Sequence, residues 1–117
     1  MMLTLLKGKI HRATVTKADL DYEGSIGVDE TLLKAAGIIP FERVEIYNIT
    51  NGSRFNTYAI PMKADGGEIQ INGAAAHLTK PKDLVIICAY AQMSPEEAKK
   101  FTPEVVLVDE KNKVKHV

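Results

Sequence analysis

The sequence predicts a mainly β protein in which short strands close, or nearly close, into a barrel. Short runs of β-branched and aromatic residues recur along the chain, and each run is bounded by Pro, Gly, Asn, Ser or charged residues. Only two short helical patterns interrupt these runs, and neither is long enough to cover both faces of a parallel sheet. Six or more short strands with so few helices are typical of a closed β architecture.

The strand candidates follow one another along the chain. Apolar and polar residues alternate over positions 3–16. Further β-rich runs cover positions 44–50, 54–60, 67–73, 83–90 and 104–110. Asn51 and Gly52 lie between two of these runs, and this dipeptide is a strong signal for a tight hairpin turn. The runs on either side of it are therefore expected to pair as antiparallel strands.

Two short helices carry clear start and stop signals. Asp29 is placed to cap the run ETLLKAA, and Gly37 is placed to end it. Ser94 is placed to cap PEEAKK, with proline in the first turn and Glu97 as its capping-box partner. The closing run KNKVKHV shows no such signal and is predicted to be a loose tail.

The bulk properties exclude several classes of protein. At 117 residues, the chain is expected to form one domain, residues 1–117. Its 15 basic and 15 acidic residues balance, which argues against nucleic acid as a partner. The single cysteine, Cys88, lies in an apolar run and cannot form an intrachain disulfide or a thiolate zinc site. We find no signal peptide and no apolar run of about 20 residues, so we expect a cytoplasmic protein that does not enter the membrane.

Two strands present cations on one face. If residues 3–16 are extended, Lys7, Lys9 and His11 project together, because alternate side chains share a face. Arg54 and Tyr58 share a face of another strand in the same way. Such groups suit the binding of a carboxylate and the donation of a proton. The alternative is a solvated edge strand, on which lysine protects against unwanted pairing.

The stretch INGAAAH suggests a backbone anion site. Asn72 and Gly73 have turn chemistry, and the small alanines that follow let another group approach the backbone closely. Unpaired N–H groups at such a turn hold an oxyanion or a carboxylate, although a plain turn into a short helix fits equally well. The three histidines lie far apart without paired carboxylates, so we expect no metal site.

Four stretches, KGKIHR, YEGS, TNGSRFNTYAI and INGAAAH, occur in this order along the chain. Each is weak alone, and Gly-Ser by itself is a common turn. Together they resemble the pyruvoyl-dependent aspartate 1-decarboxylase family, from Leu5 to about Asp109. The resemblance implies a six-stranded double-psi β-barrel with two or three short helices, assembled as a homotetramer. It also implies self-cleavage between Gly24 and Ser25.

The implied maturation divides the chain into residues 1–24 and 25–117. The Ser25 hydroxyl would attack the Gly24 carbonyl and convert the amide to an ester, with Gly24 in a strained conformation that exposes its carbonyl. By similarity, the Thr57 hydroxyl would stabilise the oxyanion. Elimination would then leave dehydroalanine, which hydrolyses to a pyruvoyl group. That group would be the cofactor, with neither a metal nor pyridoxal phosphate.

The implied reaction is the decarboxylation of L-aspartate at its α carbon through a Schiff base to the pyruvoyl group. Its products are CO2 and β-alanine, the precursor of pantothenate. The catalytic residues that the resemblance implies are Ser25, Thr57 and Tyr58, with Tyr58 returning a proton to the α carbon. The substrate-binding positions that match the family are Lys9, His11, Arg54, Thr57, Asn72, Gly73, Ala74 and Ala75.

Several alternatives stay open at this point. Thr57 and Tyr58 are adjacent, so a regular strand sends them to opposite faces, and either a bulge or a site shared between subunits would reconcile their roles. A non-enzymatic barrel module, such as a small regulator of transcription, is a different class of function. A third possibility is a precursor that stays unprocessed without an accessory maturation protein.

Overall fold

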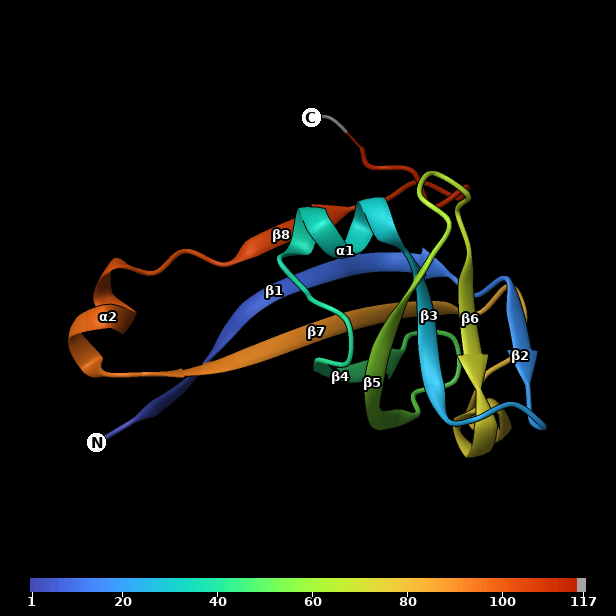
Figure 1. Ribbon diagram of the computed structural model, residues 1–117, viewed down its shortest axis with the longest axis horizontal. Coiled ribbons are helices and arrows are strands. Elements are labelled where there is room, and N and C mark those ends of the chain that lie inside the picture. The colour runs from blue at the N-terminus through green and yellow to red at the C-terminus, as the bar shows by residue number, and fades with distance from the viewer. Residues whose placement is uncertain (116–117) are drawn as a thin grey trace.

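The computed structural model describes residues 1–115, and Figure 1 shows the arrangement of their elements. The strands are β1 (Leu3–Thr14), β2 (Lys17–Asp19), β3 (Ser25–Asp29), β4 (Arg43–Asn48), β5 (Arg54–Met62), β6 (Ile69–Asn72), β7 (Leu84–Met93) and β8 (Glu104–Leu107). The helices are α1 (Glu30–Ala36), α2 (Pro95–Lys100) and the 3-10 helix η1 (Gly73–Leu78). The prediction of a mainly β chain with two or three short helices is confirmed.

The sheet closes on itself through the continuity of the chain. Its strand order is β2-β6-β3-β5-β4-β7-β1-β8. β2 follows β1 almost directly, and the Thr16 N–H donates to the Ile69 carbonyl at 2.8 Å. The segment formed by β1 and β2 therefore pairs with β7 along β1 and with β6 along β2. Counted as one position, this segment completes a ring of six, whose other members are β6, β3, β5, β4 and β7. β8 lies outside this ring, parallel to β1.

Alternating strand residues fill the inside of the ring. Residues on one face of each strand are fully buried, and they include Ile26, Val28, Val44, Ile46, Ile69, Ile71, Val85 and Ile87. They are β-branched residues at alternate positions of each strand, as expected for side chains that share one face of a sheet. Helix α1 adds Leu32, Leu33 and Ala36 to the same core. It lies so close to β1 that a Cβ atom on Gly8 would collide with the Ala36 carbonyl oxygen.

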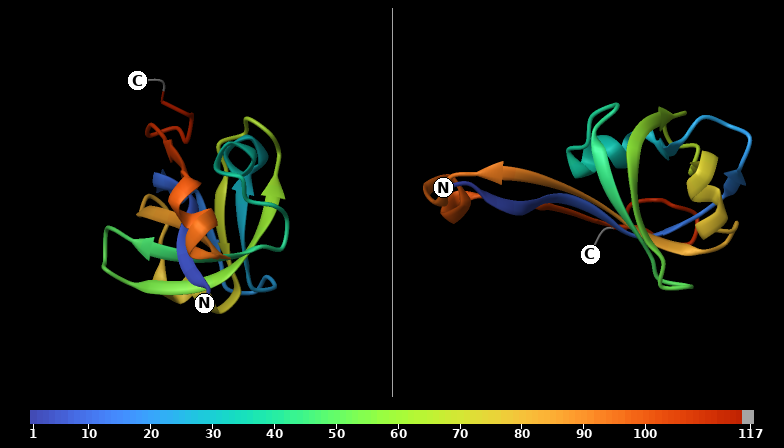
Figure 2. Two further views of the ribbon diagram at one scale, coloured as in Figure 1. Left: turned by 90° about the vertical axis from the view of Figure 1, so that its left-hand side faces the viewer. Right: turned by 90° about the horizontal axis from the view of Figure 1, so that it is seen from below.

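β1 and β7 continue beyond the ring as a two-stranded arm. Their pairing runs out to Leu3 opposite Met93, and the arm ends at α2 (Figures 1 and 2). Helix α2 buries none of its residues, whereas α1 is part of the core. Within residues 1–115, no helix has the length and apolar character needed to cross a membrane.

The local signals at helix ends and at the hairpin are confirmed. Asp29 accepts a hydrogen bond from the Thr31 N–H, and Gly37 ends α1 with a left-handed φ of 71°. Ser94 forms the predicted capping box of α2. Gly52 has a φ of 80° in the turn that joins β4 to its antiparallel partner β5.

The prediction of a loose C-terminal tail is wrong for residues 111–115. The Asn112 side chain is buried, and its Oδ1 accepts a hydrogen bond from the Thr14 N–H at 2.7 Å. Its Nδ2 donates to the carbonyl oxygens of Thr14 and Gly67, both at 2.8 Å. One amide side chain thus ties the turn to β1 and to the loop before β6, a long-range contact that composition does not reveal. Residues 116–117 of the predicted tail lie outside the described residues.

Candidate functional site

Ser25 is the first residue of β3 and is only 2% exposed. Asn72 lies directly opposite it on β6, and Asn72 Nδ2 donates a hydrogen bond to Ser25 Oγ at 3.0 Å. The Ser25 hydroxyl in turn donates to the Glu23 carbonyl at 3.4 Å. Gln70 Nε2 donates to Asn72 Oδ1 at 2.8 Å, which orients the amide so that its NH2 group faces the serine. The hydroxyl is therefore held by a partner on each side.

The backbone of Gly73 rests against the predicted cleavage point. Gly73 has a left-handed φ of 76°, and a Cβ atom on it would lie 2.7 Å from Gly24 Cα and 3.1 Å from the Tyr22 carbonyl oxygen. Gly24 does not have a left-handed φ, and a Cβ atom there would have no neighbour within 4 Å. The strained conformation expected at Gly24 stays a prediction, whereas a need for glycine is evident at Gly73, where the two segments touch.

Thr57 and Tyr58 lie on opposite faces of β5. The pairing of β5 with β4 runs without a shift from Arg43 opposite Tyr58 to Tyr47 opposite Arg54, so no bulge intervenes. On the other side, β5 runs parallel to β3, with the buried Ala59 opposite the buried Ile26. The pairing begins at Ile26 and Ala59; if the same register continued toward Gly24, Tyr58 would lie beside Ser25 and Thr57 beside Gly24.

Lys9 and Arg54 belong to a second group of side chains. Lys9 lies opposite Cys88 in the pairing of β1 with β7. The Arg54 Cζ atom lies 3.8 Å from the ring centroid of Tyr47. Within residues 1–115, neither cation forms an ion pair, whereas Lys7 binds Glu42 with Nζ 2.5 Å from Oε2. Lys7 is therefore neutralised, and Lys9 and Arg54 remain available to an anion.

The structure separates this group of cations from Ser25 within one chain. Arg54 and Tyr58 are four residues apart on β5, which corresponds to about 13 Å along a strand. The Arg54 guanidinium lies over Tyr47, on the neighbouring strand, rather than along β5 toward Tyr58. One copy of the chain therefore holds two half-sites: the Ser25 site and the Lys9–Arg54 group.

His11 lies on β1, two residues after Lys9 and opposite Leu107 of β8. Its Nδ1 is buried without a hydrogen-bond partner among residues 1–115. Burial, followed by the charges of Lys9 and Arg12, lowers the pKa of the His11 imidazole. The imidazole is therefore mainly neutral at pH 7 and does not add a third positive charge to Lys9 and Arg54.

The remaining predicted residues follow Asn72 into η1. Gly73 is buried, Ala75 packs against the core and Ala74 is exposed. Because the first N–H groups of a helix have no intrahelical partner, the N–H groups of these three residues are potential donors next to Gly24.

Sequence reasoning missed several side chains around these half-sites. Gln70 orients Asn72, and the alternation in EIQIN, which places Gln70 and Asn72 on one face, could have revealed it. Tyr47 and Tyr90 join the Lys9–Arg54 group only through the pairing of β4 with β7, which nothing in the linear sequence indicates.

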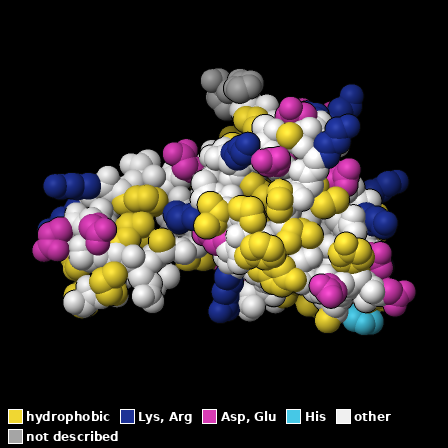
Figure 3. Space-filling model, in the orientation of Figure 1, with side chains coloured by type: hydrophobic (Ala, Val, Ile, Leu, Met, Phe, Trp, Pro, Cys, Tyr) yellow, Lys and Arg dark blue, Asp and Glu magenta, His cyan; other side chains and the backbone are white. Residues whose placement is uncertain are grey.

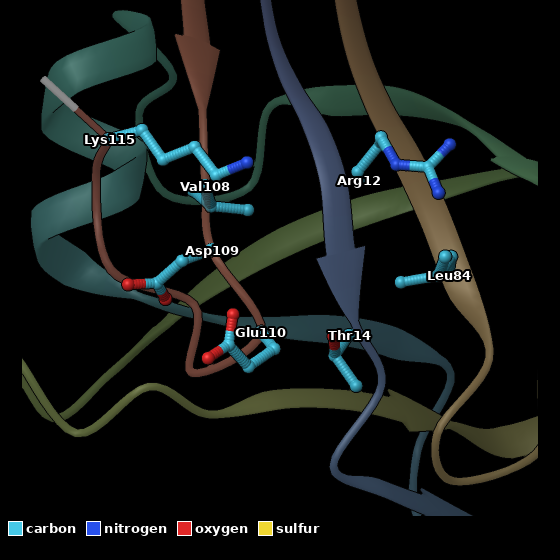
Figure 4. Close-up of a pocket in the computed structure, with 7 residues that line it drawn as sticks. All are labelled: Arg12, Thr14, Leu84, Val108, Asp109, Glu110 and Lys115. Carbon is cyan, nitrogen blue, oxygen red and sulfur yellow. The ribbon is translucent and has the colours of Figure 1, made fainter. Parts of the chain in front are cut away.

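A hollow of about 220 Å3 lies elsewhere, beside the C-terminal turn. Figure 4 shows Lys115 and Arg12 on opposite sides of it, with two carboxylates below. None of its lining residues is a predicted site residue: Arg12, Thr14, Leu84, Val108, Asp109, Glu110 and Lys115. Within residues 1–115, no group of three or more His, Cys, Asp or Glu residues is arranged to hold a metal ion.

Comparison with known proteins places the whole described chain in one family. Residues 1–115 match the family model described as Aspartate decarboxylase. A protein named aspartate 1-decarboxylase from Caulobacter vibrioides is 57% identical over 115 residues, which cover 98% of each chain. Another of that name from Clostridium beijerinckii is 56% identical over 117 residues, covering 100% of this chain and 94% of the relative. A third, from Thioalkalivibrio sulfidiphilus, is 55% identical over 97% of this chain and 90% of the relative.

Proposed function

Because the chain belongs to the aspartate decarboxylase family, we propose that it decarboxylates L-aspartate at the α carbon to give β-alanine and CO2. We further propose that its cofactor is a pyruvoyl group made from Ser25, and that its product supplies pantothenate biosynthesis. The observation that carries this proposal is the buried Ser25, whose hydroxyl is held by Asn72 directly after Gly24.

The first stage of the proposed maturation is an acyl shift. Ser25 Oγ attacks the Gly24 carbonyl carbon, the C–N bond breaks, and an ester replaces the peptide. Asn72 restricts Oγ, and the continued register of β3 and β5 offers the Thr57 hydroxyl to the oxyanion that forms on the Gly24 oxygen. Thr57 and Tyr58 can therefore have separate roles without a bulge in β5, because each faces a different residue, Gly24 or Ser25.

The second stage is an elimination. Ser25 loses its α proton, the ester C–O bond breaks, and residues 1–24 leave with a carboxylate. The dehydroalanine that remains takes up water and releases ammonia, which produces a ketone at the new end of residues 25–117. These residue types fit the group, because its formation needs only a serine side chain beside a small residue, together with one water molecule.

The pyruvoyl group supplies a ketone that condenses with the amine of aspartate and accepts the electrons of the breaking C–C bond. In the proposed site, the Tyr58 phenol lies on the face of Ser25 and returns a proton to the α carbon. Lys9 and Arg54 bind the carboxylates of the substrate. The backbone N–H groups of Gly73, Ala74 and Ala75 donate further hydrogen bonds to the substrate.

We propose that two copies of the chain complete each site within a homotetramer. The separation of about 13 Å between Arg54 and Tyr58 supports this, because aspartate is too short to span it within one chain. The exposed apolar face also supports it: Figure 3 shows apolar side chains gathered over β4 and β5. Phe41, which packs against Tyr58 with ring centroids 6.1 Å apart, is 75% exposed.

The central test follows the cleavage of purified protein by denaturing gel and mass spectrometry. Wild type is expected to give fragments 1–24 and 25–117, with the larger one lighter than its Ser-terminated form by one ammonia. Ser25→Ala is expected to remain uncut and to make no β-alanine, because alanine has neither the nucleophile nor a leaving group. Ser53→Ala, a serine in the β4–β5 turn, serves as the matched control and is expected to process normally.

Two outcomes would contradict the proposal. A free N-terminal serine found quantitatively on the larger fragment would show simple hydrolysis instead of pyruvoyl formation. A wild-type chain that stays whole, both alone and after incubation with cell extract, would exclude self-processing. Cleavage only with the extract would instead assign an accessory maturation protein to the same chemistry.

A further inference from the structure

Two tyrosines that the proposed mechanism does not use meet beside Arg54. The Oη atoms of Tyr47 and Tyr90 lie 2.8 Å apart. Glu45 on β4 lies opposite Cys88 on β7, and the two tyrosines stand on either side of this pair in the sheet. Their side chains therefore lean toward each other across Cys88 and meet at their hydroxyls.

The same Tyr47 ring carries the Arg54 guanidinium. Arg54 lies directly opposite Tyr47 in the pairing of β4 with β5, with Cζ 3.8 Å from the ring centroid. A guanidinium over an aromatic face keeps the N–H groups at its rim free for two parallel hydrogen bonds to a carboxylate. Within residues 1–115, Arg54 forms no ion pair that would compete for those donors.

The contact between the two hydroxyl groups restrains both tyrosine side chains. The hydrogen bond to Tyr47 and, after it, burial raise the pKa of Tyr90 well above its ordinary value, so its hydroxyl stays protonated across the neutral range. Tyr90 also lines, with Arg43 and Glu45, a hollow of about 120 Å3 on this face. If the Arg54 side chain is already held in place before the substrate arrives, it loses less side-chain entropy on binding. The substrate then binds more tightly, so a lower concentration of substrate occupies the site.

We propose that Tyr47 and Tyr90 act as positioning residues: Tyr90 anchors the Tyr47 ring through their hydroxyl contact, and the ring orients Arg54 to bind a carboxylate of aspartate. This inference rests on the proposed function, because it gives the Arg54 guanidinium a substrate carboxylate to meet. Neither tyrosine touches the reacting atoms in this assignment. Their effect is therefore expected in KM rather than in kcat.

The test measures the steady-state kinetics of fully processed protein. Tyr90→Phe is expected to raise KM for L-aspartate by about 3- to 10-fold, the range of one lost hydrogen bond, with kcat within about twofold of wild type. Tyr47→Phe is expected to match it, and the double variant is expected to be no worse than either single one, since all three lose the same contact. Gln92→Ala, an exposed residue further along β7, is the matched control and is expected to behave as wild type.

A double-mutant cycle separates positioning from general structural damage. In an Arg54→Ala background, Tyr90→Phe is expected to change kcat/KM no further, because the group that it positions is gone. The inhibition constant of succinate, a dicarboxylate that cannot react, is expected to rise in parallel with KM. An unchanged KM in Tyr90→Phe, or the same fall in kcat/KM in both backgrounds, would overturn the inference.

The failure of this inference is distinguishable from failure of the proposed function. If wild type processes itself and makes β-alanine while Tyr90→Phe retains wild-type KM, only the positioning role is lost. If wild type neither processes nor makes β-alanine, both are overturned together, and that result comes from wild type alone.

Discussion

At the scale of single residues, the candidate site is defined by the close approach of several segments to Ser25 and Gly24. Asn72 holds Ser25 Oγ at 3.0 Å, and Gly73 lets the start of η1 rest on Gly24. Ser25 is buried, so its hydroxyl has few partners other than these protein groups. The geometry at Ser25 is thus set mainly by its neighbours across the sheet, not by the turn dipeptide itself.

We predict that Gly73→Ala slows self-cleavage strongly. Its Cβ would lie 2.7 Å from Gly24 Cα, and its left-handed φ disfavours any L side chain by about 1 kcal/mol. Displacing Gly24 by about 1 Å is expected to cost about 10²-fold in rate, measured from the time course of cleavage on gels. Ala74→Gly, at the next position, is the control, and equal cleavage rates for Gly73→Ala and wild type would refute the close contact.

At the scale of elements, β5 carries two functions on its two faces. Its antiparallel pairing with β4 is regular, and its parallel pairing with β3 runs from Ile26 opposite Ala59 to Asp29 opposite Met62. The same strand begins at Arg54, which lies over Tyr47 of β4. The alternation of a regular strand is therefore sufficient to place Thr57 and Tyr58, with their separate proposed roles, on opposite faces of β5.

We predict that Thr57→Val and Tyr58→Phe fail at different steps. Thr57→Val keeps the shape and removes an oxyanion donor, which is expected to slow cleavage by about 2.7–4 kcal/mol of barrier. Tyr58→Phe is expected to cleave normally and to lose about 10²- to 10⁴-fold in β-alanine formation, because only turnover needs its phenol. Both are followed by gel and by assay of β-alanine. An uncut Tyr58→Phe beside a normally cut Thr57→Val would reverse the two assignments.

At the scale of the whole molecule, one chain presents two incomplete half-sites and an apolar face. Tyr58 lies at the middle of β5, and Arg54 lies at its start, about 13 Å away along the strand, with the tyrosine pair beside it. Exposed apolar side chains gather over β4 and β5 (Figure 3), and the arm of β1 and β7 extends beyond the ring (Figure 2). Assembly of copies would cover this face and bring the half-sites of different chains together.

We predict that Ser25→Ala and Arg54→Ala complement each other when they are co-expressed. Arg54→Ala alone is expected to lose about 10- to 100-fold in kcat/KM, the cost of a charged hydrogen bond, and Ser25→Ala alone is inactive. In mixed assemblies, about a quarter of the sites combine an intact Ser25 of one copy with an intact Arg54 of another, so β-alanine formation recovers toward that fraction. The two proteins mixed after separate assembly are the control. No recovery in co-expressed samples would place both residues of each site in one chain.

The sequence by itself determined the local elements and the chemical types at the site. Short runs of β-branched and aromatic residues located six of the eight strands, but not β2 and β3. Asp29, Gly37, Ser94 and Gly52 marked the helix ends and the hairpin, because caps and turns depend on nearby residues only. The four stretches that resemble the decarboxylase family identified Ser25 for the same reason, since each stretch is local and their order is visible in the chain.

Only the tertiary structure decided which of these elements meet. The closure of the ring through β1 and β2, the Asn112 contacts that order the C-terminal turn, and the tyrosine pair above Cys88 all join residues at least 43 positions apart. It also revealed a need for glycine at Gly73, where the backbone rests on Gly24. Such contacts depend on strand register and on packing of the whole ring, which no local pattern encodes, because a residue's preference for a strand says nothing about its partner across the sheet.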